Sequence, residues 1–141
     1  MPGLAPTLYP LLRYEDAPAA IAWLKDAFGF QEHQVVANED GTIAHAELTY
    51  GSSVLMLGSD RDDALLGRRA GLGWIYVAVD DPDAHCERAR AAGAEIVTEL
   101  HDTDYGSREY AARDLEGNLW SFGTYRVAVK EAEQAAPATS G

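Results

Sequence analysis

The sequence has one cysteine, few basic residues and no long apolar run, and each shortage excludes a class of protein. Cys86 alone cannot form an intramolecular disulfide or a thiolate metal site, so we expect a reducing compartment, the cytoplasm. Eleven Lys and Arg stand against 23 Asp and Glu, a net charge of −12. Because nucleic acids and anionic membranes bind clustered cations, we expect neither as a partner. No stretch approaches the roughly 20 apolar residues of a membrane span.

What the sequence does contain is one pattern of segments that occurs twice. Each copy begins with a short apolar strand, continues with an amphipathic helix and ends with three further strand-like segments. Asp16 and Gly29 delimit the first helix, and Asp81 and Gly93 lie 65 and 64 residues further on, at the ends of the second. The strands are expected at 8–14, 31–37, 42–49 and 53–57, and again at 73–79, 95–99, 107–113 and 119–125.

This repeat predicts an α+β fold of two tandem βαβββ modules, in which curved sheets surround a cavity and the helices cover the convex sides. We place the first module at 7–58 and the second at 73–126. The charged, aperiodic segment 59–72 between them is expected to be a linker or lid. The segment 127–141, rich in Ala, Glu, Pro, Thr and Ser, is expected to be a disordered tail.

The organising stretch of the second module is 105–125, which has the pattern of a β-hairpin around Gly117. A four-residue turn at 115–118 predicts that Arg113 faces Trp120 and that Tyr110 faces Gly123. In that register Trp120 and Phe122 belong to the core. The opposite face, with the composition of a binding-site wall, would hold Arg108, Tyr110, Ala112, Leu119, Ser121 and Tyr125.

Three segments, RYEDAPAAIAWLKDAFGF, VAVDDPDAHCERARAAGAEIV and RDLEGNLWSFG, resemble the vicinal oxygen chelate superfamily, which includes glyoxalase I, bleomycin-resistance proteins and extradiol dioxygenases. The C-terminal part is most similar to a bacterial glyoxalase-like branch. The resemblance covers 8–125 and implies the two-module fold and a homodimer. It also implies metal-ligand positions at the first and last strands of each module, which fall on Tyr9, Met56, Trp74 and Ser121. Because none of these side chains suits a divalent cation, we expect no metal and no cofactor.

One pair of residues could carry acid–base chemistry. A two-residue turn at Gly51-Ser52 places Glu47 opposite Met56 and His45 on the same face. The pair could be catalytic in an enzyme, but we favour a hydrogen bond between the two side chains or to a ligand. The other three histidines, His33, His85 and His101, are interpreted as solvated.

The sequence favours a metal-free binding protein, similar to the bleomycin-resistance type, for an aromatic metabolite or antibiotic. The alternatives are a glyoxalase-like lyase or isomerase with a non-standard active site, and a dimeric accessory protein without its own ligand. Tyr and Trp side chains with a few polar groups suit a flat organic molecule. The predicted ligand-binding residues are Tyr9, His45, Glu47, Met56, Trp74, Tyr76, Arg108, Tyr110, Ser121 and Tyr125.

Overall fold

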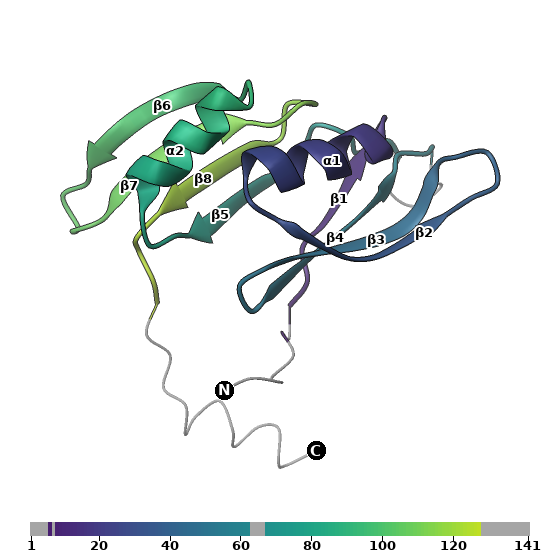
Figure 1. The fold of residues 1–141 in the computed structure, drawn as a ribbon, viewed down its shortest axis with the longest axis horizontal. Helices are drawn as coiled ribbons and strands as arrows, with labels where there is room; N and C mark the ends of the chain where they lie inside the picture. The colour runs from purple at the N-terminus through teal and green to yellow at the C-terminus, as the bar shows by residue number, and fades with distance from the viewer. Residues whose placement is uncertain (1–5, 7, 63–66, 128–141) are drawn as a thin grey trace, which may run out of the picture.

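The computed structural model describes residues 6, 8–62 and 67–127, and it confirms the α+β fold with two βαβββ modules (Figure 1). The first module consists of β1 (Leu11–Tyr14), α1 (Ala17–Ala27), β2 (Gln31–Ala37), β3 (Ile43–Tyr50) and β4 (Ser53–Ser59). The second consists of β5 (Trp74–Ala78), α2 (Pro82–Ala91), β6 (Glu95–Asp102), β7 (Arg108–Arg113) and β8 (Leu119–Gly123).

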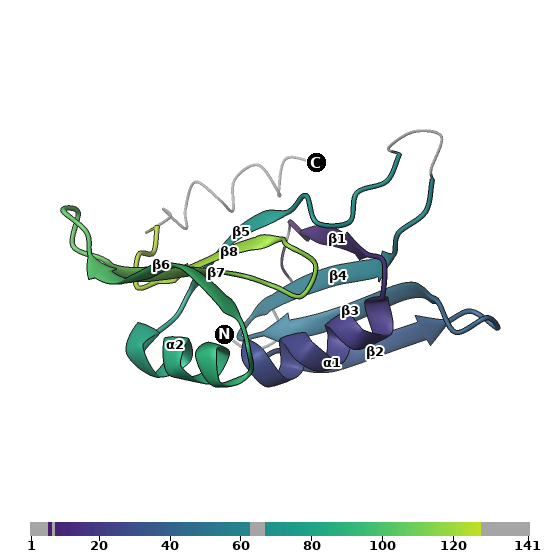
Figure 2. The ribbon, with the colours of Figure 1, turned by 90° about the horizontal axis from the view of Figure 1, so that it is seen from above.

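Each module folds into one four-stranded mixed sheet, and the two sheets have the same topology. Their strand orders are β1-β4-β3-β2 and β5-β8-β7-β6, and the first strand of each module pairs in parallel with its last. The sheets lie side by side with both helices on one side, and no closed barrel forms within the described residues (Figure 2). We call the opposite side, away from the two helices, the open face.

The two helices start at the predicted positions because the same capping residues precede them. The carboxylates of Asp16 and Asp81 accept hydrogen bonds from the backbone N–H groups of Ala19 and Ala84, at 3.2 and 3.1 Å. A proline follows in the first turn of each helix, where its missing N–H is not needed. The two copies of the sequence repeat therefore begin their helices in the same way.

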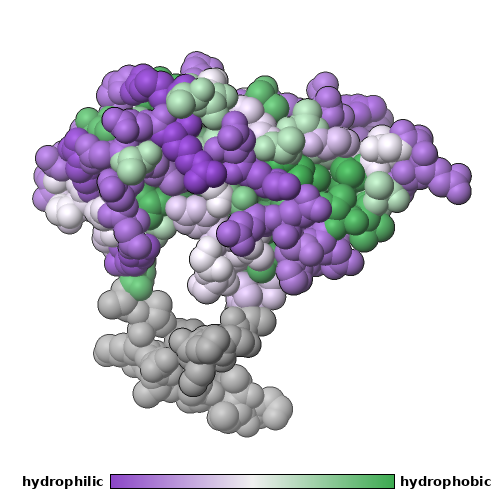
Figure 3. All heavy atoms as spheres, viewed as in Figure 1, coloured by the Kyte–Doolittle hydropathy of each residue, from purple (hydrophilic) through white to green (hydrophobic). Residues whose placement is uncertain are grey.

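The helices also join the two modules to each other. The Arg88 guanidinium on α2 donates to the carbonyls of Asp26 and Lys25 at the C-terminal end of α1, where helix carbonyls lack intrahelical partners. In the other direction, the Trp23 indole N–H donates to the carbonyl of Ala92 at 3.1 Å. The outer surface of the molecule in the region of α2 is largely hydrophilic (Figure 3).

A cluster of aromatic rings fills the space between the helices and the second sheet. The Phe28 ring, which is fully buried, lies 4.8 Å from Phe122, 5.3 Å from Trp120 and 5.0 Å from Trp23, measured between ring centroids. Because Phe28 belongs to the first module and two of its partners to the second, the modules share one core. The assignment of Trp120 and Phe122 to the core agrees with these contacts.

The predicted register of the β7–β8 hairpin is wrong by one residue. The structure pairs Arg113 with Leu119 and Tyr110 with Phe122, and the loop closes with the Asp114 N–H donating to the Asn118 carbonyl at 3.0 Å. The Asp114 carboxylate stabilises this loop, since it accepts the N–H groups of Glu116 and Asn118. A shift of one residue exchanges the two faces of a strand. Arg108, Tyr110 and Ala112 therefore lie on the helix side.

The same turn ties the second module to the start of the first. The buried Asp114 carboxylate accepts hydrogen bonds from the Tyr14 hydroxyl at 2.6 Å and from the Trp120 indole N–H at 3.0 Å. Burial and the neighbouring carboxylate raise the pKa of Tyr14 well above its usual range, so its proton stays on the hydroxyl. The Glu116 carboxylate accepts the backbone N–H groups of Glu15 and Asp16 just before α1.

The described ends of the segment between the modules are hydrogen-bonded to each other. The Asp60 carboxylate accepts the backbone N–H groups of Arg69 and Ala70, which joins the two ends of the predicted linker or lid. Residues 63–66 of this segment and residues 128–141 of the predicted tail lie outside the described residues. Within the described residues, no helix is long and apolar enough to cross a membrane.

Candidate functional site

The first sheet places His45, Glu47 and Met56 together on the open face. The predicted pairing of Glu47 with Met56 is confirmed, because the Gly51-Ser52 turn joins β3 and β4 as expected. The His45 Nε2 atom lies 3.0 Å from a Glu47 carboxylate oxygen, so the two side chains are hydrogen-bonded. Both are only partly exposed. The predicted acid–base pair is therefore present as a structural unit.

A third polar residue joins this pair and was missed by the sequence interpretation. The His33 Nε2 atom lies 3.9 Å from the second oxygen of Glu47. An irregularity in the β2–β3 pairing between Glu32 and Gln34 leaves His33 outside the regular ladder. Plain alternation along β2 does not reveal such a bulge. The His33 side chain is exposed, as the interpretation of a solvated residue requires, but that interpretation did not foresee its ion pair with Glu47.

The second sheet presents Trp74, Tyr76 and Ser121 on the open face. The Trp74 side chain is 72% exposed, and its indole N–H donates to the Ser121 hydroxyl at 3.3 Å. Tyr76, two residues further along β5, is 41% exposed. Tyr9, which precedes β1, and Tyr125, which follows β8, are also exposed. These aromatic side chains remain available for contact in the single chain.

The structure removes Arg108 and Tyr110 from this face. Tyr110 is buried against Phe122, with its hydroxyl 2.5 Å from the His85 Nδ1 atom, and burial raises the pKa of Tyr110. Arg108 forms ion pairs with Asp83 on α2 and with Asp102, which raise its own pKa. Both predicted placements on the cavity wall are therefore wrong, for the single reason that the hairpin register is shifted.

The interpretation of His85 as a solvated helix residue is also wrong. Its Nε2 atom lies 3.0 Å from the Phe28 carbonyl, and its ring centroid lies 4.3 Å from that of Phe122. Burial lowers the pKa of His85, which favours the neutral ring. The residue is a polar link between the two modules, which no pattern within α2 predicts.

The register places Glu109, which the sequence interpretation did not select, on the open face. Its carboxylate accepts hydrogen bonds from three hydroxyl groups: Tyr76 at 3.0 Å, Tyr105 at 2.9 Å and Ser107 at 2.9 Å. Burial raises the pKa of Glu109, but the three hydroxyl donors and, to a lesser extent, the charge of His101 together lower it more, so the net pKa is below its usual range. The group is a stable carboxylate at neutral pH.

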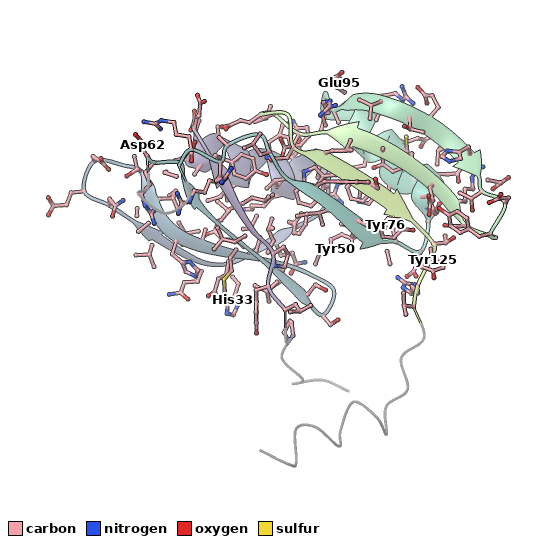
Figure 4. All side chains as sticks on the ribbon, turned by 180° about the vertical axis from the view of Figure 1, so that it is seen from behind. His33, Tyr50, Asp62, Tyr76, Glu95 and Tyr125 are labelled. Carbon is pink, nitrogen blue, oxygen red and sulfur yellow. The ribbon has the colours of Figure 1, made fainter. Side chains whose placement is uncertain are left out.

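A cavity of about 430 Å³ lies in the groove between the two sheets. Its lining comes from the β3–β4 hairpin on one side and from β5 on the other, with Phe30 and Trp120 contributing from the core. Among the residues that the structure describes, Tyr76 is the one predicted ligand-binding residue in the lining of this cavity. Figure 4, viewed from the side opposite the helices, shows Tyr50 in this region and Tyr76 and Tyr125 close together on the second sheet.

The chain belongs to the glyoxalase/bleomycin resistance protein/dioxygenase superfamily, whose family model matches residues 6–122. It is 34% identical over 128 residues to an uncharacterized protein of Mycobacterium tuberculosis strain H37Rv, over 86% of this chain and 75% of that protein. TioX from Micromonospora sp. ML1 shares 35% identity and a TM-score of 0.71, over 89% of this chain and 100% of TioX. A family enzyme from Burkholderia phytofirmans PsJN, at 21% identity, has the same fold with a TM-score of 0.64, over 82% of this chain and 94% of that one.

The side chains at the four expected metal positions do not fit a divalent cation. Met56 offers a thioether, Trp74 an indole that donates its N–H to Ser121, and Tyr9 a phenol. Such cations prefer imidazole, carboxylate, thiolate or water ligands. Across residues 8–62 and 67–127, no group of three or more His, Cys, Asp or Glu side chains has the geometry to hold a metal ion. We therefore assign no chemistry to a metal.

Proposed function

We propose that the protein binds a flat aromatic metabolite or antibiotic on the open face of its sheets, without the metal site of its superfamily. The observation that carries this proposal is the exposure of Trp74, 72%, beside Tyr76 on one strand. Large aromatic side chains that lie next to each other in contact with water are typical of surfaces that bind another molecule. Superfamily membership supports small-molecule binding as the class of function. The single buried cysteine supports the cytoplasm as its location.

The Trp74 ring is expected to contribute binding energy directly. Trp74→Ala should weaken the binding of a planar aromatic ligand by about 1 kcal/mol or more, roughly fivefold, because stacking on an indole is lost. A thermal-shift screen of aromatic metabolites supplies the ligand, and titration calorimetry with the wild type and the variant measures the change. Trp74→Phe retains a ring and should keep most of the affinity. Equal affinities for the wild type and the alanine variant would contradict a site on this face.

We further propose that the protein is a homodimer in which the open face of one copy covers that of the other. The two sheets of one chain lie side by side and face the same way (Figure 2). A twofold axis would therefore set the first sheet of each copy over the second sheet of its partner, and the same contact would form twice. This arrangement would give the ligand a second wall.

The dimer is tested by a pair of substitutions with nearly equal exposure. Leu11 on the open face is 58% exposed, and Leu115 in the β7–β8 turn is 54% exposed. Leu11→Asp should convert the dimer to a monomer, since an unpaired carboxylate in the interface is costly, whereas Leu115→Asp should leave it unchanged. Sedimentation at micromolar concentration measures both. A wild-type protein with the mass of one chain would reject the dimer.

A glyoxalase-like lyase or isomerase remains the second candidate, because His45 and Glu47 form a hydrogen-bonded imidazole–carboxylate pair on the open face. The two functions respond differently to substitution. In a binding protein His45→Ala and Glu47→Ala lower affinity, whereas in an enzyme they abolish turnover while ligand binding is retained. Product analysis of every ligand found in the screen separates the two. Steady conversion that disappears in either variant would favour the enzyme.

A further inference from the structure

We propose that the ligand of this site carries a positive charge, and that Glu109 with its aromatic neighbours recognises the cationic nitrogen. This inference rests on the proposed function, since it names the chemical class of the ligand for the same face. The sequence pattern pointed the other way, because Arg108 was expected on the face and a guanidinium selects anions. With Arg108 paired to Asp83 and Asp102 on the helix side, that reason no longer applies.

The first support is the charge of Glu109, which its hydrogen-bond partners leave uncompensated. Three donors to its carboxylate are neutral hydroxyls, from Tyr76, Tyr105 and Ser107. Within the part of the chain that the structure describes, no Lys or Arg side chain forms an ion pair with Glu109. His101 on β6 pairs with Glu109 in the ladder and lowers the pKa of Glu109 less than the hydroxyl donors do, and within the described residues no ion pair joins the two side chains. A bound cation would supply the missing charge.

The second support is the set of aromatic rings around this carboxylate. The rings of Tyr105 and Tyr125 meet edge to face at 5.8 Å, and the Tyr125 N–H donates to the Tyr76 hydroxyl at 3.1 Å. Aromatic faces attract cationic nitrogen through the ring quadrupole, and a carboxylate beside them adds to that attraction. The three tyrosines and Glu109 therefore offer both of the groups that recognise an organic ammonium.

The third support is the way in which the backbone makes room for Glu109. Glu109 on β7 reaches Tyr76 on β5 across the intervening strand β8, where it pairs with Gly123. A Cβ atom at Gly123 would overlap both the Glu109 side chain and the Tyr76 hydroxyl. The glycine allows the carboxylate to lie over the sheet at this point. A residue with a side chain would block the contact that holds the charge in place.

The arrangement also sets the shape of the ligand. Tyr76 donates its hydroxyl to Glu109 at 3.0 Å, and Trp74 lies two residues away on the same face of β5. A ligand whose ring packs against Tyr76 can therefore place an amino group beside Glu109 if one or two bonds separate the ring from the amine. This geometry defines the class as an aromatic compound with a protonated amine close to its ring system.

The test uses three naphthalene derivatives that share one ring system and differ in charge: 1-naphthylmethylammonium, 1-naphthylmethanol and 1-naphthoate. Titration calorimetry at about 0.15 M salt limits long-range effects of the net charge. The ammonium compound should bind about tenfold more tightly than the alcohol, and the carboxylate most weakly. Glu109→Gln should reduce the affinity for the ammonium compound about tenfold and change that for the alcohol less than about twofold.

A matched variant controls for charge alone. Glu95 lies on β6 of the same sheet, at the far end from Tyr76 and Tyr125 (Figure 4). Glu95→Gln removes the same charge and should leave the preference for the ammonium compound intact. Equal binding of ammonium and alcohol would overturn this inference while the proposed aromatic site stands. A loss of preference in Glu95→Gln equal to that in Glu109→Gln would also overturn it, and no binding of any of the three compounds would overturn the proposed function itself.

Discussion

Replacing Asp114 with asparagine should destabilise the protein by about 3 kcal/mol, although the two side chains have nearly the same shape. The Asp114 carboxylate accepts hydrogen bonds on both oxygens: one faces the Tyr14 hydroxyl and the Trp120 indole, and the other faces two backbone N–H groups of the turn. An amide group has one oxygen and one donor nitrogen. In either orientation, the NH2 group of the asparagine amide would face N–H or O–H donors in a buried site, and those donors would lose their acceptor.

Urea unfolding followed by circular dichroism measures this effect. Asp104→Asn, in the exposed β6–β7 turn, makes the same exchange on a side chain in contact with water, and it should change the free energy of unfolding by less than about 0.5 kcal/mol. If Asp114→Asn unfolds at the same urea concentration as the wild type, the hydrogen-bond network does not contribute to stability as described. A nuclear magnetic resonance signal of the Trp120 indole N–H would then report which partner it retains.

Phe28→Ala should cost about 4 kcal/mol, the largest effect that we expect from a single side chain. The ring is fully buried at the junction of the modules and touches Trp23 from its own module and Trp120 and Phe122 from the other. Removal leaves a cavity that rigid aromatic neighbours cannot fill. Phe28→Ala should therefore lower the overall stability, and it should also make the two modules unfold at different urea concentrations.

Two spectroscopic probes distinguish these consequences. Tryptophan fluorescence reports on the shared core, and far-ultraviolet circular dichroism reports on the secondary structure of both modules. In the wild type the two transitions should coincide, while in Phe28→Ala the fluorescence change should come at lower urea concentration. Leu115→Ala, at an exposed turn position, serves as the control and should leave both transitions in place. A variant within about 1 kcal/mol of the wild type would contradict the shared core.

The sequence predicted the modules and the first hairpin because their signals are local. Asp16 and Asp81 cap helices with contacts three residues away, and the Gly51-Ser52 turn fixes the pairing of Glu47 with Met56. Both kinds of signal depend on neighbouring residues alone. The fold class, the helix starts and the His45–Glu47 pair followed from these signals and agree with the structure.

The β7–β8 register failed for the opposite reason. The loop there closes around the Asp114 carboxylate, which also accepts a hydrogen bond from the Tyr14 hydroxyl 100 residues earlier in the chain. A propensity argument confined to 105–125 has no access to that contact. The error exchanged the two faces of β7, which brought Arg108 and Tyr110 into the predicted site and left Glu109 out. His85 and His33 were misjudged likewise, since their partners lie on other elements.

The bonds from the β7–β8 turn to the start of α1 have a consequence for synthesis on the ribosome. The N–H groups of Glu15 and Asp16 and the Tyr14 hydroxyl emerge first, yet the carboxylates that accept their hydrogen bonds, Glu116 and Asp114, are translated about 100 residues later. The contacts of the first module are therefore complete only after the end of the second module has been translated, because these hydrogen bonds join residues far apart in the sequence. A nascent chain that stops before the last hairpin exposes the unfinished core of its first module to chaperones and proteases.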